Sequence, residues 1–138
     1  EKPQTKKERV LVKRLCLSLG LLQPGDSRDV IVDVLHVLFR SRKKKQLLSV
    51  DDIEKKVVMN RKLHKLPLQG IAPSNIRRQV KRLRNLMLVE KVKSKYRISE
   101  FLGVGEIFAE KIEKFLLAGV VQRVKEYLSA ADELFGKK

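Results

Sequence analysis

Three residues of the chain have types and spacing that suit a divalent metal ion: Asp29, Asp33 and His36. On a helix drawn at about 100° per residue they fall within about 60° of one another, and carboxylates with an imidazole are common metal ligands. Arg40 joins the same face one turn later, however, and no cysteine or second histidine supports the site. We therefore predict a polar helix face exposed to solvent here, and no metal site.

Other catalytic patterns are missing from the sequence. His64 stands among Arg61, Lys62 and Lys65, a setting that favours a phosphate-adjacent side chain over a general base. The sequence has no glycine-rich phosphate loop, no G-x-S-x-G motif and no paired carboxylates in an apolar setting. Its single cysteine, Cys16, leaves no partner for a disulfide or a cysteine-based zinc site and fits a reducing compartment. The sequence predicts a protein that is not an enzyme and needs no cofactor.

The chemistry that the sequence does offer is cationic, and it is concentrated in one region. The chain has 32 Lys and Arg against 16 Asp and Glu, for a net charge of +16. Residues 60–99 hold 12 basic residues and one acid, Glu90, whereas residues 101–138 hold six of each. Positive charge gathered in one part of a folded chain favours a polyanion as partner.

The centre of this basic region has the pattern of an amphipathic helix. Pro73 suits the first turn of a helix, where its missing N–H is no loss. Ile76, Val80, Leu83 and Met87 fall on one narrow stripe, which we predict faces the core. The other side offers cations, amides and a hydroxyl but no carboxylate: Ser74, Arg78, Lys81, Arg82 and Asn85, with Asn75, Arg77, Gln79 and Arg84 on its flanks.

A short basic hairpin follows. Residues 89–92 and 96–99 alternate as strands do, and residues 93–95 form a tight turn between them. Val92, Tyr96 and Ile98 are predicted to point to one side of the hairpin. The cations are predicted to point to the other side: Lys91, Lys93, Lys95 and Arg97.

A basic helix joined to a basic hairpin by a short apolar corner, residues 85–91, resembles the recognition helix and wing of winged helix-turn-helix DNA-binding proteins of the bacterial and archaeal transcriptional-regulator type. The resemblance covers residues 28–99. It implies a mainly α fold with a small β-hairpin, and double-stranded DNA as the partner. The helix would read bases in the major groove through Ser74, Asn75, Arg78, Gln79 and Arg82. Phosphate contacts would come from Arg77, Lys81, Arg84, Lys91, Lys93, Lys95 and Arg97.

Three helices are predicted before the basic helix. After a charged and frayed segment 1–7, residues 8–22 form a helix that must pack on the domain or on another subunit, because it is apolar at Val10, Leu11, Leu15, Leu19 and Leu22. A second helix runs from Asp26 or Ser27 to about residue 44. A third begins at the capping residue Ser49, has Asp51, Asp52 and Glu54 in its first turn, and ends near residue 65. The connector within 60–72 is longer than the 3 to 4 residues of the usual helix-turn-helix turn.

The C-terminal region is predicted to pair two copies of the chain. Gly103 and Gly105 mark a hinge, and residues 106–135 read as one long helix whose first apolar face is Phe108, Ile112, Phe115 and Leu116. A coiled-coil seam follows: Leu117, Val120, Val124, Tyr127, Ala131 and Leu134. The alternative is that this helix folds back over Leu11, Leu15 and Leu19 within one monomer.

The sequence thus predicts an N-terminal helix and linker (1–25), a winged helix-turn-helix domain (26–100) and a C-terminal dimerisation helix (101–138). The leading hypothesis is a homodimeric DNA-binding protein, a transcriptional regulator associated with the nucleoid in the cytoplasm. An architectural or replication and partition factor, and a winged-helix module for protein interaction, remain as alternatives. No apolar run approaches the roughly 20 residues of a membrane-spanning helix, and the sequence does not reveal a small-molecule effector.

Overall fold

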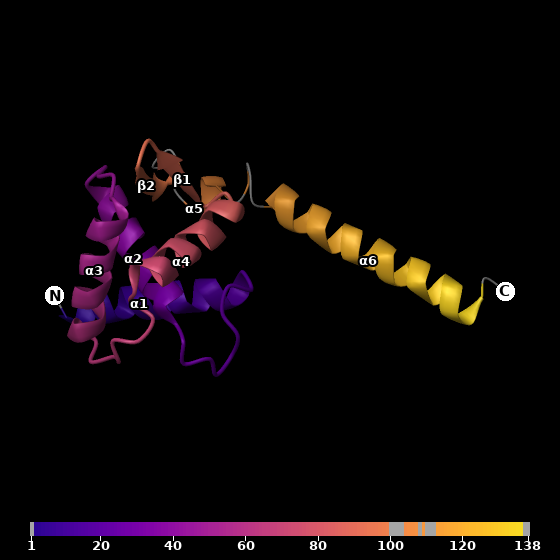
Figure 1. Ribbon diagram of the computed structural model, residues 1–138, viewed down its shortest axis with the longest axis horizontal. Helices are drawn as coiled ribbons and strands as arrows, with labels where there is room; N and C mark the ends of the chain where they lie inside the picture. The colour runs from indigo at the N-terminus through magenta and orange to yellow at the C-terminus, as the bar shows by residue number, and fades with distance from the viewer. Residues whose placement is uncertain (1, 100–103, 108, 110–112, 137–138) are drawn as a thin grey trace. The chain divides into compact units, whose positions relative to one another are not determined.

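The computed structural model of the chain describes residues 2–99, 104–107, 109 and 113–136 (Figure 1). The structure divides into two compact units, residues 1–102 and 103–138. The first unit contains α1 (Lys2–Ser18), α2 (Val30–Lys43), α3 (Val50–Leu63), α4 (Pro73–Asn85), β1 (Val89–Val92) and β2 (Lys95–Ile98). The second contains α5 (Val104–Ile107) and α6 (Glu113–Phe135). The predicted fold class, mainly α with a small antiparallel hairpin and a long C-terminal helix, is confirmed.

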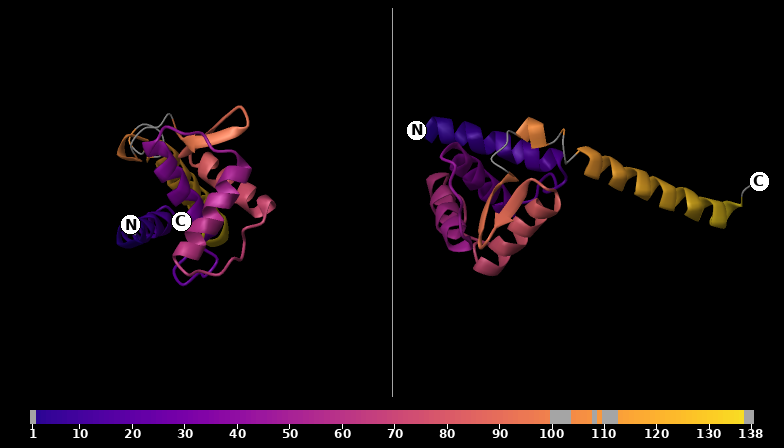
Figure 2. Two further views of the ribbon diagram at one scale, coloured as in Figure 1. Left: turned by 90° about the vertical axis from the view of Figure 1, so that its left-hand side faces the viewer. Right: turned by 90° about the horizontal axis from the view of Figure 1, so that it is seen from above.

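Helix α2 is the centre of the first unit. Every residue from Val30 to Leu38 is buried, and the helix contacts α1, α3, α4 and β2. A helix enclosed on all sides must be apolar nearly all round, which explains the unusual density of Val and Ile in this segment. The right-hand view of Figure 2 shows α1 and α4 on opposite sides of the first unit, and α2 contacts both. The two helices therefore present separate surfaces to solvent.

The start of α3 agrees with the predicted cap. Ser49 Oγ accepts a hydrogen bond from Asp52 N, and Asp52 Oδ2 accepts one from Ser49 N, both at 3.1 Å. This reciprocal capping box satisfies two amides that the helix itself leaves unpaired. Just before it, Leu48 and Tyr96 exchange backbone hydrogen bonds of 3.0 and 2.8 Å. The entrance of α3 is therefore tied to β2.

Helix α4 buries three of its four predicted core residues: Ile76, Val80 and Leu83. The prediction for Met87 is wrong, because this side chain is 45% exposed. The helix ends at Asn85, and Met87 takes a left-handed backbone conformation with φ of 64°. That turn points Met87 outward, whereas Leu86 and Leu88 enter the core.

The strands pair as expected, but their register corrects the predicted faces of the hairpin. Lys91 lies opposite Tyr96 and Val92 lies opposite Lys95. Directly opposed residues share a face of an antiparallel pair, so Lys91 shares the face of Tyr96, and Val92 shares that of Lys95. The prediction grouped Val92 with Tyr96 because it placed Lys95 in the turn, whereas Lys95 is the first residue of β2.

Helix α1 begins at Lys2, so the prediction of a frayed segment 1–7 is wrong from that residue onward. Its buried face is Thr5, Arg9, Val12 and Cys16. Val10 and Leu11, which were expected to pack on the domain or on another subunit, are 45% and 69% exposed in the single chain. The helix packs on α2 through a partly polar face, and Leu15 and Leu17 beside that face are half-buried.

The connector between α3 and α4 is long, as predicted, and α3 still packs against α4. Within it Gly70 has a φ of +76°, and a Cβ built there would lie 3.1 Å from Val30 Cγ2 and 3.1 Å from Asn75 Nδ2. Glycine meets both demands, because it adopts positive φ without strain and lets the connector approach α2 closely.

In the second unit, α6 runs from Glu113 to Phe135 without a break at Gly119. Of the helix predicted over 106–135, the structure describes residues 106–107 in α5 and 113–135 in α6. Phe108 and Ile112 of its predicted apolar face, and Gly103 of the predicted hinge, lie outside the described residues. Gly105 lies within α5. None of the described side chains of α6 is buried. Over the part of the chain that the structure describes, no helix is both long and apolar enough to cross a bilayer.

Candidate nucleic-acid interface

The solvent face of α4 carries a continuous set of polar and cationic side chains. Those that are exposed are Ser74, Arg77, Arg78, Lys81, Arg84 and Asn85. No acidic residue occurs between Ala72 and Val89. Because the apolar residues of α4 all face the core, the amphipathic pattern that forms the helix also turns its cations outward.

Three of the five predicted base-reading side chains take part in hydrogen bonds within the protein. Asn75 Nδ2 donates to Gly70 O at 2.7 Å, and Gln79 Nε2 donates to Asn75 Oδ1 at 3.0 Å. Arg82 donates from Nη1 to Gln79 Oε1 at 3.0 Å and from Nη2 to Leu21 O at 2.7 Å. This chain of bonds ties α4 to the α3–α4 connector at one end and to the segment after α1 at the other.

Asn75, Gln79 and Arg82 are accordingly half-buried, whereas Ser74 and Arg78 are exposed. A side chain that already uses its donors inside the protein has less capacity for an outside partner. The structure thus divides the predicted set into an anchored flank and an open face.

The hairpin divides in the same way. Lys93 and Lys95 are exposed at the turn, where Lys93 has a φ of 59°. Arg97 forms an ion pair with Glu90 of the opposite strand, and both are half-buried. The ammonium group of Lys91 lies 5.9 Å from the centre of the Tyr96 ring. Of the four predicted phosphate ligands of the hairpin, Lys91, Lys93 and Lys95 are exposed, and Arg97 is half-buried against Glu90.

The polar face of α2 is buried, which corrects the prediction that it is exposed to solvent. Asp33 is 0% exposed and accepts four hydrogen bonds of 2.7 to 3.0 Å, two from Arg9, one from Asn60 and one from Arg61. Asp29 accepts from Arg9 Nη2 at 3.1 Å and from Arg61 Nη1 at 3.0 Å. Burial acts to raise the pKa of Asp29, but Arg61 and Arg9 outweigh it and hold that pKa below its ordinary value.

His36 extends this network towards α1. Asn60 Nδ2 lies 3.2 Å from His36 Nδ1, and Glu8 Oε1 lies 2.9 Å from His36 Nε2. These partners assign the proton of the neutral ring to Nε2, because the amide can only donate and the carboxylate can only accept. Burial lowers the pKa of His36, against the opposing effect of Glu8. Arg40 also reaches Glu8, at 3.0 Å.

The network joins α1, α2 and α3, and we name it the ionic cluster: Glu8, Arg9, Asp29, Asp33, His36, Asn60 and Arg61. Within the described ranges, no group of three His, Cys, Asp or Glu side chains is arranged to hold a metal ion. The sequence pattern did not identify Glu8, Arg9 or Asn60 as members of a site. One signal was present, because Arg9 shares the helical spacing of Val12 and Cys16 and therefore lies on the buried face of α1.

The residues of the predicted dimer seam all lie on α6. Leu117, Val120, Val124, Tyr127 and Leu134 are exposed, and Ala131 is half-buried. Large apolar side chains repeated along one exposed helix are typical of a surface that pairs with another chain.

No family model, curated protein or solved structure matched this chain. The geometry of α4 and of the hairpin therefore carries the functional argument by itself.

Proposed function

We propose that the first unit binds double-stranded DNA through the open face of α4 and the turn of the hairpin, and that the protein is a homodimeric transcriptional regulator of winged-helix type. The observation that carries this proposal is the exposed face of α4, which has four cations and no acid. Polyanion binding needs such a face, because each phosphate that a Lys or Arg neutralises releases a counterion.

The structure suggests how the contacts are shared. Ser74, Arg78, Lys81 and Asn85 occupy the middle of the open face, opposite the buried stripe, and would enter the major groove. Arg78 is the candidate for bidentate pairing with guanine, which a guanidinium can make with O6 and N7. The remaining cations would hold phosphates and so position the helix: Arg77 and Arg84 on its flank, and Lys93 and Lys95 at the hairpin turn.

The anchored flank has a different role in this proposal. Arg82, Gln79 and Asn75 fix the orientation of α4 against Leu21 and Gly70. Readout needs side chains on a rigid element, since a tilt of the helix would move every base contact at once.

Helix α6 would pair two copies through its seam, from Leu117 to Leu134. Its region has no net charge, so two copies can approach without strong repulsion. A two-fold dimer would read two half-sites spaced by about one turn of DNA, roughly 34 Å, or by a multiple of it.

The test is duplex binding measured by fluorescence anisotropy, with selection from a random duplex pool to find the preferred site. Arg78→Ala should cost about 1 to 3 kcal/mol on that site and relax its base preference. Arg14→Ala, which removes an equal charge from an exposed site on α1, is the matched control and should change binding little. Equal effects of the two substitutions on every duplex would contradict the role given to α4.

The same measurements separate the alternatives. An architectural or partition factor would bind all duplexes from the pool about equally and would still need Arg78 and Lys81. A protein-interaction module would bind no duplex at physiological salt.

A further inference from the structure

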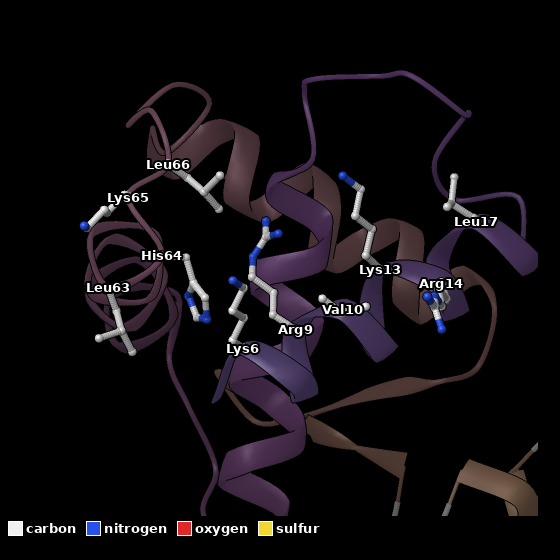
Figure 3. Close-up of a pocket in the computed structure, with 10 residues that line it drawn as sticks. All are labelled: Lys6, Arg9, Val10, Lys13, Arg14, Leu17, Leu63, His64, Lys65 and Leu66. Carbon is white, nitrogen blue, oxygen red and sulfur yellow. The ribbon is translucent and has the colours of Figure 1, made fainter. Parts of the chain in front are cut away.

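A groove lies on the α1 side of the first unit, between α1 and the C-terminal end of α3 (Figure 3). Its volume is about 660 Å³, within the range of cavities that hold small organic ligands. Since α1 and α4 lie on opposite sides of the first unit, this groove is separate from the proposed DNA face (Figure 2).

The walls of the groove are apolar and its charges are of one sign. Its apolar lining is Val10 and Leu17 of α1, Leu63 of α3 and Leu66 of the connector. The lining also includes Lys6, Arg9, Lys13, Arg14, His64 and Lys65, and no carboxylate. Arg9 is held by Asp29 and Asp33, and Lys13 Nζ lies 3.8 Å from Asp29 Oδ2. Lys6, Arg14 and Lys65 are exposed and take no part in the ionic cluster.

His64 adds a buried polar atom to this setting. Its Nδ1 lies 2.7 Å from Asn60 O, so Nδ1 carries a proton and donates it. Its Nε2 is buried and has no hydrogen-bond partner among the residues that the structure describes. Such an atom costs about 1 to 3 kcal/mol while it stays unpaired. It can accept a hydrogen bond from a ligand N–H or O–H group.

We propose that this groove binds a free organic anion, a small molecule with an apolar body and one acidic group. The apolar body would cover the exposed sides of Val10 and Leu63, which water now contacts. The acidic group would lie near Lys6 and His64, which lie side by side in Figure 3, with Lys65 in the lining beyond His64. Charge and shape both select this class, because cations without carboxylates exclude a cationic ligand, and the apolar walls disfavour a bare inorganic ion.

The probe for the experiment is anilinonaphthalene sulfonate, a fluorescent dye with an apolar body and one anionic group. Phenylnaphthylamine has the same rings without the sulfonate and serves as the uncharged comparison. The full chain should bind the sulfonate dye at one site, at least about tenfold more tightly than the amine, since about 1.4 kcal/mol of charge attraction suffices for that ratio. Equal affinities for the two dyes would overturn the assignment of an anion.

Two charge-matched variants locate the binding. Lys6→Glu combined with Lys65→Glu should weaken binding of the sulfonate dye at least about tenfold. Lys93→Glu combined with Lys95→Glu makes the same charge change at the hairpin turn and should leave dye binding unchanged. Equal loss in both variants, or no loss in the first, would refute a site in the groove. Duplex binding is measured on the same proteins, so a failure of the DNA proposal shows independently.

The imidazole NMR signals give a second readout of position. The chain has two histidines, and His36 is buried within the ionic cluster whereas His64 lines the groove. The dye should shift the His64 signals, assigned with His64→Asn, and leave those of His36 in place. Saturating dye that moves neither signal would place it elsewhere, for example on the exposed apolar side chains of α6, and would overturn the proposal.

Discussion

Asp33→Asn should be strongly destabilising, although the two side chains have nearly the same size. Asp33 is 0% exposed and accepts bonds from two guanidinium groups and the amide of Asn60. An asparagine can keep about half of these bonds, since its NH₂ group would face donors. Arg9 and Arg61 would then share one buried carboxylate, that of Asp29.

The expected cost follows from those contacts. Breaking a buried ion pair by removing one partner costs about 3 to 5 kcal/mol, because an uncompensated charge stays buried. For a unit of about 100 residues this corresponds to a fall in Tm of about 15 to 25 °C. Urea unfolding followed by circular dichroism gives the free energy, and a thermal scan gives the Tm.

Labelling of the single cysteine provides a second measurement. Burial raises the pKa of the Cys16 thiol to about 12, so α1 must detach before the thiol reacts. Asp33→Asn should speed labelling by about two to four orders of magnitude, since each 1.4 kcal/mol is tenfold.

Asp51→Asn is the matched control, because Asp51 is exposed in the first turn of α3 and should lose less than about 1 kcal/mol. Should Asp33→Asn fail to fold, Asp29→Asn at the edge of the cluster tests the same reasoning. An Asp33→Asn protein within about 1 kcal/mol of the wild type would refute the argument that the ionic cluster holds α1 in place.

Arg82→Ala should lower the free energy of unfolding by about 1 to 3 kcal/mol, because Leu21 O loses its charged donor. Arg78→Ala should leave the free energy of unfolding unchanged. Urea unfolding measures both, and equal stability of the two variants would contradict the anchoring role of Arg82. Burial lowers the pKa of His36, so the unfolded chain binds a proton more readily than the folded chain, and the free energy of unfolding should fall as the pH drops below 6.5. His36→Asn should lose this pH dependence. The loss of stability that comes from protonation of Asp29 should set in below pH 3.8 in both the wild type and the variant. Duplex affinity should fall as the salt concentration rises. If six phosphates are neutralised, a plot of log K against log salt concentration should have a slope of about −5 or steeper. A slope shallower than about −2 would contradict the electrostatic model. Val124→Glu should convert the dimer into a monomer in sedimentation equilibrium, because it puts a charge into the seam of α6. A variant that stays dimeric would exclude α6 as the pairing element. A wild-type protein that is monomeric would exclude the dimer itself.

Much of the fold follows from local rules that act within a few residues. The cap at Ser49, the proline at the start of α4 and the alternation in the hairpin each depend on neighbours in sequence, so the approximate positions of α3, α4 and both strands were predictable, whereas the register of the hairpin was not. The division of charge was equally plain, because it needs no three-dimensional information. The open face of α4, with Arg78 and Lys81, follows from the helical period alone.

The tertiary structure decided which polar side chains face water. Periodicity places Asp29, Asp33 and His36 on one face of α2, but it cannot say that Arg9 and Arg61, distant in sequence, arrive there to neutralise the carboxylates. The same limit applies to Arg82, which is cationic in the sequence and anchored to Leu21 O in the fold. A polar residue is equally compatible with solvent and with a buried partner, and the choice between them depends on contacts across 20 or more residues that no local pattern encodes.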